Sequence, residues 1–169
     1  EVEEREEYID YLNKEISGII SKMMVSETNE KTSELISLYF KMTGNIERIG
    51  DHAVNICDYT KIIEEKEIKF SRQARAELKE MKQICHNMFR YFQREIEDTK
   101  KWLEDLHEME RFVDTKTQEF YNSHLMRMKR GECNDEACII YSEMLVDFER
   151  IGDHLWNMAK AMREIAEEV

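Results

Sequence analysis

Hydrophobic residues recur every three or four positions through most of the chain, a spacing that predicts a few long amphipathic helices. The first helix is expected over about Glu3–Met24 and the second over about Glu34–Glu65, with the polar run SETNEKTS at 26–33 between them. The apolar positions with helical spacing in the first helix are Tyr8, Leu12, Ile16, Ile19 and Met23. This pattern is typical of an all-α protein.

Three further helices are predicted, over about Arg72–Glu97, from Asp98 or Thr99 to about Arg130, and from just after Asn134 almost to Val169. Ser71 is a suitable N-cap for the third helix, because a serine side chain accepts a hydrogen bond from a free backbone N–H of the first turn. Gly131 fits the position after the end of the fourth helix, where a left-handed residue commonly closes the last turn. The chain is therefore expected to form about five long helices.

Composition supports one helical domain. The 169 residues include no proline and five glycines, so the chain is poor in the residues that make turns. A charged fraction of 37% and 11 methionines fit a soluble helical bundle, and the length suffices for one domain with its own core.

The net charge and the cysteine spacing disfavour several classes of partner and cellular setting. The net charge of −12 disfavours nucleic acid and anionic membrane surfaces as partners. The cysteines show no CxxC spacing, which favours reduced thiols in an intracellular protein. A disulfide between Cys133 and Cys138 under oxidation is the minor alternative. No apolar stretch approaches the roughly 18 residues that a membrane span needs.

Two segments of the chain are nearly identical. Asn45–Ile56 reads NIERIGDHAVNI and Asp147–Met158 reads DFERIGDHLWNM, so the core ERIGDH returns after 102 residues. Repeated helices usually match in their apolar positions and diverge in their charges. Here the charged residues match, which indicates that the chain builds one polar site twice.

The repeat extends to the helix before each ERIGDH segment. Glu6 and Asp10 form an ExxxD pair that Glu110 and Asp114 match 104 residues later. The first repeat is assigned to 1–66 and the second to 67–169, together one domain of tandem three-helix bundles. The second repeat has a leading helix at 72–97 with no counterpart in the first. We expect the first bundle to lack its leading helix, about 30 residues by the repeat offset. Its absence is expected to leave an apolar groove that a partner covers.

Carboxylates four residues apart lie on one face of a helix. If the pairs of neighbouring helices face each other, each repeat holds four carboxylates around one point, a suitable cage for one or more metal ions. The candidate ligands are Glu6, Asp10, Glu47 and Asp51 in the first repeat, and Glu110, Asp114, Glu149 and Asp153 in the second. A chain with 37 acidic residues holds roughly eight such pairs by chance, so the repetition carries this interpretation. The alternative is carboxylates neutralised by Arg48, Arg150 or water.

The other repeated residues have structural explanations. His52 and His154 point about 100° away from the carboxylates, because they follow the aspartate directly on a helix, and we interpret them as hydrogen-bonded structural histidines. Gly50 and Gly152 lie within helices, where they favour close approach of a neighbouring helix. Glu104 and His107 form a single ExxH, whereas a ferritin-like di-iron site needs two.

The doubled ERIGD followed by NI or NM, with ExxxD on the preceding helices, resembles the PhoU family over nearly the whole chain. The resemblance implies two three-helix bundles whose E(D)xxxD motifs bind multinuclear clusters of divalent or trivalent metal ions, iron or zinc. It assigns the eight carboxylates named above as ligands. Family members are either cytoplasmic regulators of phosphate transport and of the phosphate-sensing kinase, or cytosolic C-terminal domains of sodium/phosphate cotransporter-like proteins. The start of the sequence at Glu1 is more similar to a cytosolic C-terminal domain of this kind than to a separate regulator.

We therefore expect a non-enzymatic, metal-binding, cytoplasmic regulatory domain of phosphate uptake. Its partners are a phosphate transporter, on the same polypeptide or another, or the phosphate-sensing kinase, and it forms a homodimer. Contact with a membrane is expected through an attached transporter domain, at its cytosolic face. The alternatives are a carboxylate-bridged dinuclear metalloenzyme, for which the sequence supplies no convincing general base, and a plain dimeric helical interaction module.

Overall fold

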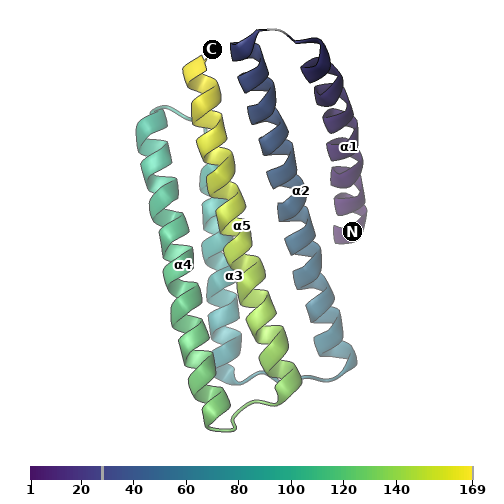
Figure 1. The fold of residues 1–169 in the computed structure, drawn as a ribbon. Helices are drawn as coiled ribbons and strands as arrows, with labels where there is room; N and C mark the ends of the chain where they lie inside the picture. The colour runs from purple at the N-terminus through teal and green to yellow at the C-terminus, as the bar shows by residue number, and fades with distance from the viewer. Residues whose placement is uncertain (28, 169) are drawn as a thin grey trace.

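Five long helices make up the fold in the computed structural model, which describes residues 1–27 and 29–168 (Figure 1). They are α1 (Val2–Ser26), α2 (Glu30–Glu65), α3 (Arg72–Phe92), α4 (Thr99–Lys129) and α5 (Asp135–Glu168). The prediction of an all-α protein with about five long helices is confirmed.

Local hydrogen bonds fix several helix ends at the predicted residues. The side chains of Ser71, Asp98 and Asn134 accept hydrogen bonds from backbone N–H groups three residues ahead, at 3.1, 3.1 and 2.7 Å. Gly131 has a φ of +66°, which a residue with a side chain rarely adopts, and it follows the last turn of α4. These ends were predictable because each depends on residues within one turn.

Two helix ends differ from prediction. α2 begins at Glu30 and not at Glu34, because the Asn29 side chain accepts a hydrogen bond from the Thr32 N–H at 3.3 Å and caps the helix earlier. α3 ends at Phe92 and not at Glu97. There the Phe92 ring packs on the Trp102 ring of α4, with 5.7 Å between centroids, and the chain turns back through residues 93–98. α3 therefore ends where its last residue packs on α4.

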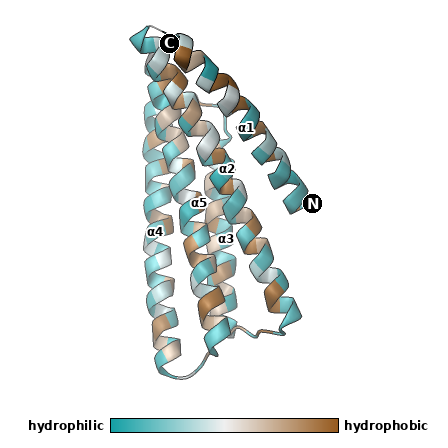
Figure 2. Ribbon diagram, turned by 45° about the vertical axis from the view of Figure 1, so that its right-hand side comes forward, coloured by the Kyte–Doolittle hydropathy of each residue, from teal (hydrophilic) through white to brown (hydrophobic). Residues whose placement is uncertain are grey.

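α3, α4 and α5 pack against one another as a three-helix bundle, and α2 lies along α5. Among the described residues α1 packs against α2 alone, and Figure 2 shows it running at an angle to the other helices. The second repeat is thus a complete bundle and the first consists of two helices. No helix in the described part of the chain combines the length and apolarity that crossing a membrane requires.

The hydrophobic core is centred on the second repeat. Its most deeply buried side chains are Tyr141, Met81, Met88, Leu106, Leu145, Leu155 and Val113. Most of the large apolar residues of α1, in contrast, are exposed, with Tyr8 at 61% and Ile19 at 57%. In the second repeat α3 covers α4 and α5, whereas no described helix covers α1 and α2 in that way. The expected apolar groove is present as a cavity of about 560 Å³, lined among others by Ile9, Ile46 and Phe89.

A buried ion pair ties the second repeat together. Arg127 of α4 donates two hydrogen bonds to Glu77 of α3, at 2.7 and 3.0 Å. Ser123 donates to the same carboxylate at 2.9 Å, and the Tyr141 hydroxyl of α5 donates to it as well. Burial alone would raise the pKa of Glu77, but these hydrogen bonds outweigh it and hold the pKa below its ordinary value.

Candidate metal centres

The first carboxylate cluster lies where α1 packs on α2. Glu6 and Asp10 of α1 and Asp51 of α2 each place a carboxylate oxygen within 4.8 Å of the others, and all three side chains are half-buried. The pKa of Glu6 is raised by partial desolvation and next by the charges of Asp10 and Asp51. Three negative groups so close repel one another unless a cation or protons intervene.

The second cluster repeats this arrangement where α4 packs on α5. Glu110 and Asp114 of α4 and Asp153 of α5 bring their oxygens within the same 4.8 Å. Burial raises the pKa of Glu110 and of Asp114, and the charge of Asp153 raises both further. The two clusters thus use equivalent residues of the two repeats.

Glu47 and Glu149 lie at the margins of these clusters. Neither belongs to the tight group of three oxygens, but charges of the cluster raise the pKa of both. Burial raises the pKa of Glu47, with Asp51 and Asp10 adding to it. Burial likewise raises the pKa of Glu149, followed by Asp114 and Asp153. The structure therefore brings six of the eight predicted ligands together tightly and holds the other two beside them.

The clusters differ in how much positive charge the chain already supplies. In the second, Arg150 donates a hydrogen bond to Asp153 at 2.8 Å from one turn earlier on α5. In the first, Arg48 is exposed and acts on Glu47 through its charge. Neutralisation by arginine, the alternative to metal binding, is thus realised for one carboxylate of the second cluster.

Glycines set the spacing of the helices at both clusters. A Cβ at Gly50 would meet Ile9 and Glu6 of α1 at 3.5 and 3.8 Å, and one at Gly152 would meet Val113 of α4 at 3.2 Å. The paired helices approach closely beside Asp51 and Asp153, as expected from the mid-helix glycines. This close approach allows carboxylates of two helices to reach one point.

Replacing Gly50 by alanine is expected to raise the free energy of unfolding by up to about 1 kcal/mol, because alanine favours a helix interior by that amount. The new Cβ would make an ordinary contact with Ile9. Gly152→Ala is expected to gain less or to destabilise, because Val113 is fully buried and would have to shift. Urea denaturation of both variants measures the difference. Equal stabilisation by the two would contradict it.

The repeated histidines join α2 to α5 on another face. His52 contacts Asp147 through Nδ1 at 2.6 Å, and His154 contacts Asn45 through Nδ1 at 2.9 Å. The two rings stack with 5.5 Å between centroids. Asn45 and Asp147 are equivalent positions of the repeat, so each histidine reaches across to the first residue of the other motif. The interpretation as hydrogen-bonded histidines is confirmed.

Sequence reasoning missed these partners. Asn55, which is four residues beyond Asp51, donates a hydrogen bond to Asp147 at 3.2 Å and so takes part in this second face. The available signal was a polar residue seven positions before each histidine, a spacing that places both on one helix face. That signal does not identify which helix lies opposite.

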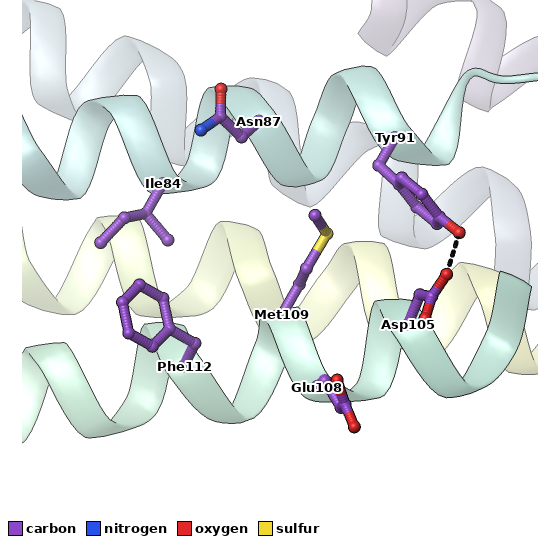
Figure 3. Close-up of a pocket in the computed structure, with 7 residues that line it drawn as sticks. All are labelled: Ile84, Asn87, Tyr91, Asp105, Glu108, Met109 and Phe112. Carbon is purple, nitrogen blue, oxygen red and sulfur yellow. Dashed lines mark hydrogen bonds between the residues drawn. The ribbon is translucent and has the colours of Figure 1, made fainter.

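Two other polar features do not build a carboxylate metal site. The His107 ring stacks on the Trp156 ring, with 4.8 Å between centroids. Glu104 forms an exposed ion pair with Lys100 at 3.9 Å. A groove of about 560 Å³ lies between α3 and α4. Figure 3 shows its lining residues, among which the Tyr91 hydroxyl donates a hydrogen bond to Asp105. None of the eight predicted ligands lines this groove.

Comparison with known proteins adds to this geometry. The family model described as the PhoU domain matches residues 1–60 and 78–162. The chain is 28% identical over 163 residues to the phosphate-specific transport system accessory protein PhoU homolog 1 of Thermotoga maritima, over 93% of this chain and 68% of that protein. The crystal structure of PhoU from Pseudomonas aeruginosa matches the fold with a TM-score of 0.74, at 18% identity, over 99% of this chain and 80% of that one.

Proposed function

We propose a function from one premise, that this chain belongs to the PhoU domain family. On that premise the chain is a regulatory domain of phosphate uptake that binds metal ions at its two carboxylate clusters. The observation that carries the proposal is the repetition of the cluster: equivalent Glu and Asp residues of two repeats converge to within 4.8 Å at two helix pairs.

The donor sets suit the metals that the family resemblance implies. Each cluster offers carboxylate oxygens, which bind iron and also serve as zinc ligands. Glu6, Asp10 and Asp51 would hold one site, and Glu110, Asp114 and Asp153 the other, with Glu47 and Glu149 available beside them. A bound metal would supply positive charge and open coordination positions for phosphate oxygens.

We infer a regulatory rather than a catalytic role for the clusters. A hydrolytic or oxidative site needs a general base within reach of the metal. His52 and His154 are hydrogen-bonded to Asp147 and Asn45 at 2.6 and 2.9 Å, on the face between α2 and α5. Metal ions would instead fix α1 against α2 and α4 against α5, and so set the surface that a partner meets.

The proposed partner is a phosphate transporter, on the same polypeptide or another, or the phosphate-sensing kinase, at the cytosolic face of the membrane. The Thermotoga maritima relative is named as an accessory protein of a phosphate-specific transport system. Exposed apolar side chains on α1, among them Tyr8 and Ile19, provide a surface for a protein partner or for a second copy of the chain.

Elemental analysis of protein purified from metal-replete cells tests the metal sites. Asp51→Asn is expected to remove about half of the iron or zinc that the two carboxylate clusters bind, and Asp153→Asn the other half, because each aspartate is one of three clustered ligands. The double variant is expected to bind almost none at these sites. Glu64→Gln, an exposed position on α2, is the control and should leave the content unchanged. Unchanged metal in both aspartate variants would refute the assignment.

The regulatory role is tested in cells that lack the chain and receive it back. Restoration of normal phosphate uptake by the wild-type chain and by Glu64→Gln, but not by Asp51→Asn/Asp153→Asn, is the expected result. Equal uptake with and without the wild-type chain would contradict regulation while leaving the metal sites intact.

A further inference from the structure

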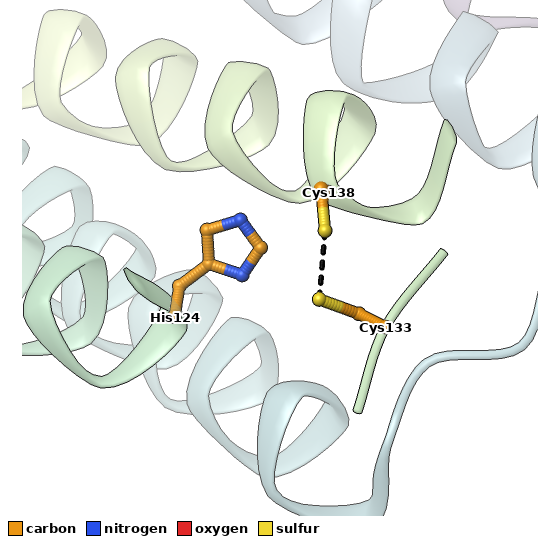
Figure 4. Close-up of side chains that lie close together, drawn as sticks. All are labelled: His124, Cys133 and Cys138. Atoms are coloured by element: carbon orange, nitrogen blue, oxygen red, sulfur yellow. Dashed lines mark hydrogen bonds between the residues drawn. The ribbon is translucent and has the colours of Figure 1, made fainter. Parts of the chain in front are cut away.

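Three metal-ligating side chains converge outside the carboxylate clusters, where α4 connects to α5 (Figure 4). Cys138 lies in the first turn of α5, Cys133 lies in the connecting segment, and His124 lies in the last part of α4. The two sulfur atoms are 2.7 Å apart, and a ring nitrogen of His124 lies within 4.8 Å of both. Figure 4 shows the imidazole ring facing the two sulfurs.

One buried ring nitrogen of His124 lacks a hydrogen-bond partner in the described part of the chain. Its side chain is 2% exposed, and its Nε2 atom has no hydrogen-bond partner among the described residues. A buried polar atom without a partner is uncommon, because burial removes the water that it would otherwise bind. One face of the ring packs on the Tyr141 ring, with 4.6 Å between centroids. A ligand that bound this nitrogen would satisfy it.

A metal ion bound at this point would have to displace the protons of both thiols. Burial raises the pKa of Cys138 to about 12, with the neighbouring Cys133 adding to the effect, so the thiol stays protonated at neutral pH. Burial also lowers the pKa of His124, with the charge of Arg127 adding to it, so the imidazole is neutral. Neutral imidazole is the form that binds metals.

Charge balance favours a divalent ion. Arg127 is nearby, but Glu77 neutralises it through a hydrogen bond of 2.7 Å. A divalent ion with two thiolates and one neutral imidazole is uncharged, and an uncharged group has the smallest cost of burial. Thiolate and imidazole together suit Zn²⁺.

We propose that Cys133, Cys138 and His124 bind one zinc ion that joins the start of α5 to α4. Binding releases the two thiol protons to solvent, and the fourth tetrahedral position is open to water. Zinc–sulfur bonds of about 2.3 Å require the sulfurs to lie about 3.7 Å apart. The Cys133 side chain would move outward to meet that distance, which its half-buried place in the connecting segment permits. A disulfide between the two cysteines would leave His124 without a role.

Titration of the reduced full-length chain with Co²⁺ tests this site separately from the carboxylate clusters. Cobalt bound to thiolate absorbs strongly in the near ultraviolet, whereas cobalt bound to carboxylates does not. One equivalent is expected to produce the band with release of two protons, and Zn²⁺ is expected to abolish it. Cys57→Ser and Asp51→Asn/Asp153→Asn should retain the band.

Ligand variants complete the test. Cys133→Ser and Cys138→Ser are expected to lose the band, and His124→Gln to weaken Co²⁺ binding by at least about 100-fold, more than the loss of a supporting residue causes. Cys133→Ser lies outside the helices, so its circular dichroism and melting should match the wild type and separate ligation from folding. A folded, reduced wild-type chain without the band would overturn the proposal. So would a band that persists in Cys133→Ser.

Discussion

Loading the chain with the metal that elemental analysis identifies is expected to raise its free energy of unfolding by about 5 kcal/mol over the chelated chain. The figure follows from two sites, each contributing about 2.7 kcal/mol at a free metal concentration of a hundred times the dissociation constant. This stabilisation arises at each cluster, where three carboxylates of two helices lie within 4.8 Å of one another and repel one another without a cation.

The pH dependence of that stability is expected to change sign with metal. In the metal-free chain, burial and then Asp114 raise the pKa of Glu110, and burial and then Asp114 and Asp153 raise that of Glu149. A carboxyl group with a raised pKa makes its full contribution to stability at pH values below its ordinary pKa of 4.5. That contribution is lost as the pH rises through the raised pKa. Mild acidification from neutral pH therefore favours the metal-free fold at these clusters. It destabilises the metal-loaded fold, because protons displace the metal.

Calorimetric melting with chelator or metal, between neutral pH and about pH 5, measures both effects. Asp51→Asn/Asp153→Asn should show neither metal stabilisation by the clusters nor the reversal, and Glu64→Gln should behave as the wild type. Identical melting of the chelated and loaded wild-type chains would contradict the prediction.

Glu77→Gln is expected to lower the free energy of unfolding by about 3–5 kcal/mol, the range for breaking a buried ion pair from one side. The Arg127 guanidinium would keep its charge in a buried site, without the carboxylate that now accepts its hydrogen bonds at 2.7 and 3.0 Å. Because Tyr141 and Ser123 donate to the same carboxylate, helices α3, α4 and α5 would all lose a shared contact.

Urea denaturation at neutral pH measures this loss, and Glu80→Gln, an exposed position on α3, is the control. The low pKa of Glu77 makes its contribution fully present above the ordinary value of 4.5 and lost as the pH falls through the lowered value. The difference between wild type and Glu77→Gln should therefore shrink on acidification. A difference below about 1 kcal/mol at neutral pH would show that the pair contributes no more than an exposed one.

Much of the candidate site could be predicted from the sequence because it depends on local spacing. Carboxylates four residues apart share a face on any helix, and the repeat identified which of many acidic pairs to choose. The sequence did not separate the tightly clustered Asp51 and Asp153 from the marginal Glu47 and Glu149. That distinction depends on the angle at which the facing helix crosses, which Gly50 and Gly152 permit but do not specify.

Other features needed residues far apart in the chain. Glu77 and Arg127 look like ordinary surface charges on amphipathic helices until α3 and α4 pack together. Cys133 and Cys138 lack a metal-binding spacing, and His124 joins them through the antiparallel return of α5 beside α4.

The sequence by itself determined the five helices, most of their ends, and the two repeated carboxylate faces, because hydrogen bonds within a turn and side-chain periodicity act over a few residues. The tertiary structure alone decided two things: the end of α3 at Phe92, and the cross-pairing of His52 with Asp147 and His154 with Asn45. Each depends on which helix lies opposite, and that choice follows from burying the apolar surface of the whole chain rather than of any one segment.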